Sequence, residues 1–114
     1  MKKLSEVLTD ESKWCKGSPF NDLSGNPCSI SNAVKCCLLG ATEIALDDTN
    51  PWFGYLLASR QLHENLRDGI VKLYPNRCEG IRDVNTNGAV IALFNDHPDT
   101  TFEDIKKLLV ETNN

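Results

Sequence analysis

The sequence predicts a mainly α protein: a compact bundle of four to five helices around a central buried helix, with residues 1–114 forming a single domain. Three observations predict it. Apolar residues recur at helical spacing in several stretches, and capping signals precede four of the expected helices. A chain of 114 residues also has room for only one hydrophobic core. The exception we expect is a short β-hairpin near residues 15–27.

The central helix is expected over residues 28–46, read as CSISNAVKCCLLGATEIAL. A helix with so few polar residues is usually buried among other helices. Ser29 or Ser31 would cap its start, because a side-chain oxygen can accept from a free N–H group there. The apolar residues that define its face are Ile30, Val34, Cys37, Ala41, Ile44 and Ala45.

Two further helices are expected before residue 75. Residues 3–11 carry a short apolar stripe of about two turns. Asn50 and Pro51 form a helix start signal, and Pro75 marks the end of that long helix. Its stripe consists of Leu62, Leu66, Ile70 and Leu73. The turn-rich residues 14–28 lie between the short helix and the central one, with the hairpin expected around residues 22–25.

The last third of the chain predicts two short helices separated by a turn. AVIALF, residues 89–94, has no evident partner strand, so we expect a buried helix capped by Asn85 or Asn87. Residues 95–99 are expected to be a turn. A capping box, formed by Thr101 with Asp104 or by the pair one residue earlier, then opens the final helix.

The charge pattern argues against two classes of partner. The 16 acidic and 12 basic residues are interspersed and give a net charge of −4, without the basic stripe that neutralises phosphates, so we expect no duplex nucleic acid partner. The longest apolar runs are far shorter than the roughly 20 residues of a membrane span. The start, MKKLSEVLTDE, lacks the apolar segment of a secretory signal, so the expected location is the cytoplasm.

The five cysteines are expected to be reduced, with no metal and no cofactor bound. Their number is odd, and Cys36 and Cys37 are adjacent in an apolar stretch. Neither a C-x-x-C pair nor an H-x-x-x-H pair is present to hold zinc. A metal site would require distant residues to converge through folding. The candidates for that alternative are Cys15, Cys28, Cys78, His63 and His97.

Three motifs resemble a small family of bacterial and phage proteins known only as a domain of unknown function. They are Trp14 followed by Gly17, the run CLLGA at residues 37–41, and Phe94-Asn95-Asp96 followed by Pro98, Thr101 and Ile105. The similarity spans roughly residues 4–110. Two departures are Asp99-Thr100, where the family pattern has Gly-Arg, and Cys36, where it has an aromatic residue. The resemblance implies a compact, mainly helical fold and no particular activity.

The candidate site is a polar cluster after residue 94, with an aromatic residue from the N-terminal loop. It comprises Trp14, Asn95, Asp96, His97 and Thr101. These residue types suit a turn that feeds a capped helix. They would equally suit the mouth of a pocket that holds a small polar ligand. Both interpretations remain open from the sequence.

The predicted function is a small intracellular, non-catalytic binding protein of bacterial or phage origin. Its partner would be another protein or a small polar ligand, and its effect would be to inhibit or sequester a host component. The alternative is a cysteine-dependent hydrolase with Cys37 or Cys15 as nucleophile and His97 as base. Cys37 is expected about two turns inside its helix, where the dipole lowers a thiol pKa little. Cys28 is nearer the helix start but has no evident partner.

Overall fold

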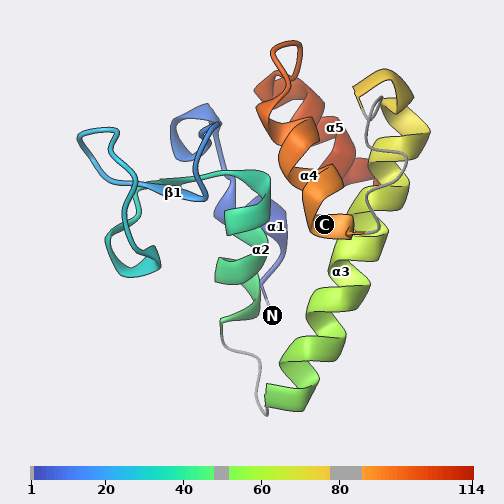
Figure 1. Ribbon diagram of the computed structural model, residues 1–114, viewed down its shortest axis with the longest axis horizontal. Helices are drawn as coiled ribbons and strands as arrows, with labels where there is room; N and C mark the ends of the chain where they lie inside the picture. Colours follow the sequence, from blue (N-terminus) through green and yellow to red (C-terminus); the bar gives the residue numbers. More distant parts are fainter. Residues whose placement is uncertain (1, 48–51, 78–85) are drawn as a thin grey trace.

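The computed structural model describes residues 2–47, 52–77 and 86–114, without the side chains of residues 52 and 53. In chain order the elements are α1 (Leu4–Val7), η1 (Glu11–Lys13), β1 (Phe20–Asn21), η2 (Ile30–Asn32), β2 (Lys35–Cys36), α2 (Leu38–Leu46), α3 (Trp52–Leu73), η3 (Pro75–Arg77), α4 (Asn87–Asp96) and α5 (Phe102–Glu111). The long α3 packs against α2, α4 and α5, while α1 lies against α2 and α5, so the chain folds around α2 (Figure 1). The predicted class, mainly α with a small hairpin, is confirmed.

The core forms where α2 meets its neighbours. Leu38, Ala41 and Ala45 of α2 have no exposed surface. Small side chains at two of these three positions let the neighbouring helices approach closely. The apolar area removed from water here is the main stabilising contribution, at about 25 cal/mol for each Å². The predicted central helix is therefore present as α2.

The start of that helix was predicted wrongly. α2 begins at Leu38, and the residues before it form η2 and β2. Val34 donates its N–H to the carbonyl of Asn21 at 2.8 Å, and Cys37 donates its N–H to Pro19 at 3.0 Å. These backbone bonds to a distant segment replace the bonds that a longer helix would have made. Ile30 is consequently 42% exposed rather than part of a buried stripe.

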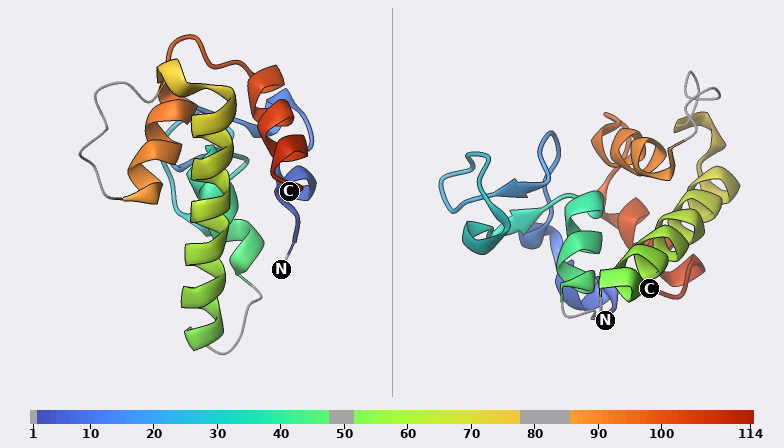
Figure 2. Two further views of the ribbon diagram at one scale, coloured as in Figure 1. Left: turned by 90° about the vertical axis from the view of Figure 1, so that its right-hand side faces the viewer. Right: turned by 60° about the horizontal axis from the view of Figure 1, so that its bottom comes forward.

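The hairpin joins β1 to β2 in antiparallel register, with Phe20 opposite Cys36. β1 lies within the predicted range of residues 15–27, whereas β2 lies within the stretch predicted to be helical. Asp22 organises the turn after β1, since its carboxylate accepts from the backbone N–H groups of Ser24 at 2.9 Å and Asn26 at 3.0 Å. The hairpin lies on the side of α2 away from α3 (Figure 2).

The two helices expected before residue 75 are both present, the first much shortened. α1 covers one turn, and its first residue, Leu4, and its C-cap, Leu8, are both buried. α3 ends before Pro75 as predicted, and on its surface Arg60 pairs with Glu64 at 3.2 Å. The start signal at residues 50–51 lies outside the described residues.

The two C-terminal helices were predicted correctly as helices, but the boundaries of the first differ from the prediction. Residues 89–94 are helical as predicted, but α4 continues through Asp96, so the first two residues of the expected turn belong to the helix. Thr86 is the N-cap of α4, rather than Asn87, and Asn85 lies outside the described residues. The capping box of Thr101 and Asp104 at the start of α5 is confirmed.

A histidine contact joins α2 to α3. The hydroxyl of Thr42 donates to the carbonyl of Leu39 at 2.6 Å, so its oxygen must accept from His63 Nε2 at 3.2 Å. His63 therefore carries its proton on Nε2 when neutral. Burial lowers the pKa of His63, because it disfavours the charged ring.

Candidate functional site

Three of the predicted site residues meet where the N-terminal loop contacts the end of α4. Asn95 has no exposed surface, and its side-chain amide lies at the centre of this contact. Its Oδ1 accepts from Trp14 Nε1 at 2.7 Å and from the N–H of Leu38 at 2.9 Å. Its Nδ2 donates to the carbonyl of Cys15 at 3.1 Å and to Asp96 Oδ1 at 3.0 Å.

The Asn95 amide thus makes all four hydrogen bonds that an asparagine side chain can make. It ties together three segments: the loop at residues 14–15, the start of α2 and the end of α4. A buried polar group that is fully bonded in this way fixes a unique arrangement of its neighbours. We call Asn95 with its four partners the Asn95 hub.

A second set of contacts extends the hub along the loop. The N–H of Gly17 donates to Asp96 Oδ1 at 2.9 Å, and Lys16 Nζ donates to the carbonyl of His97 at 2.8 Å. Gly17 has a φ of +87°, a backbone conformation that glycine adopts without the strain other residues incur. The loop is therefore held against the end of α4 by side-chain and backbone groups together.

The remaining predicted site residues lie beyond the hub. His97 is the C-cap of α4, and its Nδ1 accepts from the N–H of Asp99 at 3.1 Å. Thr101 caps α5, where its Oγ1 accepts from the N–H of Asp104 at 3.3 Å. The His97 side chain therefore satisfies a backbone group of the turn between α4 and α5, and the Thr101 side chain satisfies one in the first turn of α5. Contact of these residues, or of the hub, with a ligand stays a prediction.

The thiols lie in surroundings that disfavour the reactive thiolate form. Cys37 is the N-cap of α2 rather than two turns inside a helix, and its Sγ accepts from the N–H of Gly40 at 3.3 Å. Burial nevertheless raises the pKa of Cys37 above its ordinary value. Burial, followed by the proximity of Cys37, raises the pKa of Cys15 to about 11. A thiol with such a pKa is almost entirely protonated at neutral pH, which makes it a poor nucleophile.

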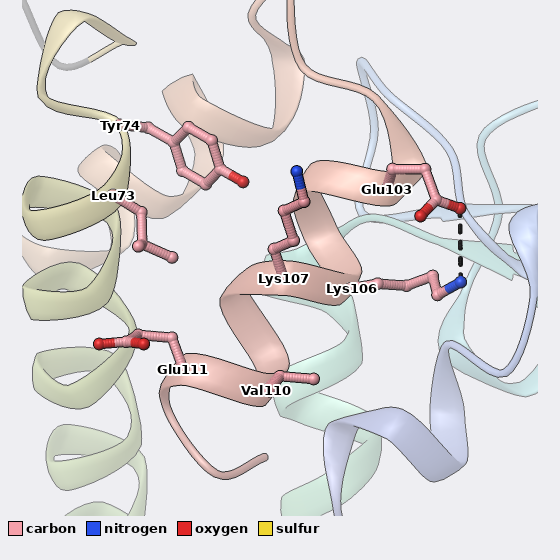
Figure 3. Close-up of a pocket in the computed structure, with 7 residues that line it drawn as sticks. All are labelled: Leu73, Tyr74, Glu103, Lys106, Lys107, Val110 and Glu111. Atoms are coloured by element: carbon pink, nitrogen blue, oxygen red, sulfur yellow. Dashed lines mark hydrogen bonds and ion pairs between the residues drawn. The ribbon is translucent and has the colours of Figure 1, made fainter.

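The structure has an open hollow that the sequence analysis did not identify. It has a volume of about 610 Å³ and lies between the end of α3 and α5, where Lys107 and Tyr74 point toward one another (Figure 3). Its walls are largely apolar. The lining residues are Leu73, Tyr74, Glu103, Lys106, Lys107, Val110 and Glu111.

A second hollow, of about 410 Å³, lies on the other side of the same helix, between α5 and α1. Lys106 and Val110 line both hollows. We call the two together the α5 groove. Val110 forms the ridge between them and is 83% exposed. In the sequence, Val110 is an apolar residue that lies outside the apolar stripe of this helix, to which Phe102 and Ile105 belong.

A smaller, more polar hollow of about 290 Å³ adjoins the α5 groove at Leu73 and Tyr74. Here His97 and Asp99 face the segment after α3, whose Arg77 is already engaged. Arg77 Nη1 donates to Asp104 Oδ2 at 2.6 Å, and its guanidinium stacks 4.7 Å from the centre of the Tyr74 ring. Although burial acts to raise the pKa of Asp104, its bonds to Arg77 and Thr101 lower it overall.

Two further features are absent from the described ranges of the chain. Residues 2–47, 52–77 and 86–114 contain no group of three or more His, Cys, Asp or Glu side chains arranged to hold a metal ion. In the same part of the chain, every helix is too short or too polar to cross a membrane.

Comparison with known proteins gives a family but no function. A family model described as a family of unknown function (DUF6197) matches residues 1–114. No curated protein matches the chain. No solved structure matches it either.

Proposed function

We propose that this chain, which belongs to DUF6197, a family of unknown function, is a non-catalytic recognition protein that binds a segment of a protein partner in the α5 groove. One observation carries the proposal. Two open hollows share Val110 and Lys106, so together they form one partly apolar surface that crosses α5 rather than a single closed cavity. Small-molecule sites are usually enclosed, whereas peptide segments occupy extended grooves.

The exposure of Val110 supports this choice. A valine on the solvent side of an amphipathic helix gains stability when a partner covers it, by about 1.5–3 kcal/mol for complete burial. Its neighbours on the same face are charged or amphipathic side chains, which resembles the polar rim that surrounds the apolar centre of many interfaces.

The proposal places the protein inside a bacterial cell, encoded by the bacterium or by a phage. A domain that acts through binding alone changes its partner by occupying the partner's surface. Inhibition or sequestration of a host protein is therefore the expected effect. The raised thiol pKa values of Cys15 and Cys37 favour this role over a cysteine hydrolase.

The test is a selection of peptides from a random displayed library, run in parallel on the wild type and on Val110→Gln. Glutamine keeps the helix and removes the apolar branch. We expect selected peptides to lose about tenfold or more in affinity for Val110→Gln. Leu23→Gln is the matched control, because Leu23 is 87% exposed on a loop and lines neither hollow.

Chemical-shift mapping with ¹⁵N-labelled protein then locates the bound peptide. Shifts confined to α1, α5 and the end of α3 would support the proposal. Equal affinity of the peptides for the wild type and Val110→Gln would refute it. Shifts centred on Trp14 and Asn95 would instead locate binding at the hub.

A second candidate is a small polar ligand in the hollow beside His97, because this hollow is bordered mainly by polar groups. A melting-temperature screen with small carboxylates and amides tests it, since a ligand that binds only the folded state raises the melting temperature. The rise should disappear in His97→Ala. An equal rise in that variant would exclude this hollow.

A further inference from the structure

Some charged side chains of the α5 groove have an oppositely charged partner in the described part of the chain, and others do not. Glu103 pairs with Lys106 at 3.3 Å, and Glu111 pairs with Lys72 of α3. Both carboxylates that line the groove therefore already have a cationic partner. Lys107, in the hollow toward α3, forms no ion pair with any residue of the described part of the chain, and the same is true of Lys3 in the hollow toward α1.

These two lysines line hollows on opposite sides of the exposed ridge at Val110. Lys107 and Val110 are three residues apart on α5, hence neighbours on its surface. Figure 3 shows Lys107 on the side of α5 that faces Leu73 and Tyr74, whereas Val110 and Lys106 extend from the other side, toward α1. Lys3 borders the second hollow together with Val110. The groove thus offers cation, apolar ridge and cation in sequence, although the whole chain carries a net charge of −4.

We propose that the α5 groove recognises an acidic protein segment in which an apolar side chain that covers Val110 is flanked by carboxylates that reach Lys107 and Lys3. This inference rests on the proposed function and adds the chemical class of the partner. Complementary charge across an interface fixes orientation and accelerates association more than it adds affinity. Lysine suits this role, because its long flexible stem lets the ammonium follow a mobile partner.

The experiment uses three synthetic peptides of one length, built from leucine with glutamate, with glutamine or with lysine. Binding to the full chain is measured by titration calorimetry at low and at high salt. We expect the glutamate peptide to bind best and to weaken as salt rises, since exposed charge pairs are screened. Preference for the glutamine or lysine peptide, or no salt dependence, would overturn the inference.

Variants assign the effect to the two lysines. Lys107→Gln and Lys3→Gln should each weaken the glutamate peptide by about two- to fivefold, the range of an exposed ion pair. Lys35→Gln is the matched control, because Lys35 is exposed on β2 and lines neither hollow. Lys107→Glu should shift preference toward the lysine peptide, a gain of binding that an unfolded variant would not show. Equal losses in all three glutamine variants would overturn the assignment.

The outcomes separate this inference from the proposed function. Binding of the glutamine peptide in the α5 groove, as well as or better than the glutamate peptide, would leave the recognition role intact and remove the acidic partner. Failure of all three peptides, together with library peptides that bind Val110→Gln as tightly as wild type, would overturn both.

Discussion

Replacement of Asn95 by alanine should destabilise the fold more than any change at the surrounding surface residues. The variant removes four hydrogen bonds and leaves two donors without a partner, the N–H of Leu38 and Trp14 Nε1. Leu38 has no exposed surface, so water cannot reach its N–H without a rearrangement. A buried donor left unpaired costs about 1–3 kcal/mol, and the half-buried Trp14 less. With the small cavity added, we expect a loss of about 3–5 kcal/mol in the free energy of unfolding.

Urea unfolding followed by circular dichroism measures this loss, and tryptophan fluorescence reports whether the loop around Trp14 has detached. Asp96→Asn is the control, because Asp96 is exposed and the amide oxygen can still accept from Gly17. It should cost less than about 1 kcal/mol, as surface changes usually do. If Asn95→Ala costs no more than this control, the amide does not hold the three segments together and the hub argument fails.

Three further predictions concern the contacts of α2 with its neighbours. Leu38→Ala should lower the free energy of unfolding by about 2–5 kcal/mol in the same urea assay, since Leu38 is fully buried, and an unchanged midpoint would mean that its surroundings collapse without loss. Gly40→Ala should also destabilise strongly, because a Cβ there would lie 2.3 Å from the carbonyl oxygen of Pro19, which belongs to the backbone and cannot rotate away; a melting temperature equal to the wild type would contradict it. Burial lowers the pKa of His63 in the folded state, so the unfolded chain binds the proton first: stability is complete above the unfolded pKa of about 6.5 and falls as pH drops through it toward the folded value. His63→Gln, which can still donate to Thr42, should abolish this part of the pH dependence in unfolding curves between neutral and mildly acidic pH.

The sequence predicted correctly those helices whose formation or ends depend on residues close together in the chain. The capping box of Thr101 and Asp104 follows from residue types three positions apart, and α5 begins where it predicts. Residues 89–94 are helical because helix satisfies their backbone groups within the segment, as the absence of a partner strand in the sequence suggested. Pro75 ends α3 for the equally local reason that proline has no N–H to donate.

The wrong predictions, of the start of the central helix and of the position of Cys37, have non-local causes. Helical spacing in residues 28–37 did not produce an α-helix, because Val34 and Cys37 bond to the segment at residues 19–21 instead. That competition depends on the arrangement of a loop more than ten residues away. The same displacement moved Cys37 from the predicted helix interior to the N-cap of α2. An error in one boundary thus became an error in the expected electrostatics of a candidate nucleophile.

The hub and the α5 groove are built on different parts of the fold, so stability and recognition should respond to different substitutions. The hub joins the N-terminal loop to the ends of α2 and α4, and its amide is shielded from solvent. The groove uses the face of α5 opposite to Ile105 and Leu108, whose side chains have no exposed surface. Because that inner face anchors α5 in the core, its outer face can present Val110 to a partner without a rearrangement of the bundle. Under the proposed role, a surface held in place in this way should lose little conformational entropy when a partner binds, which would favour affinity.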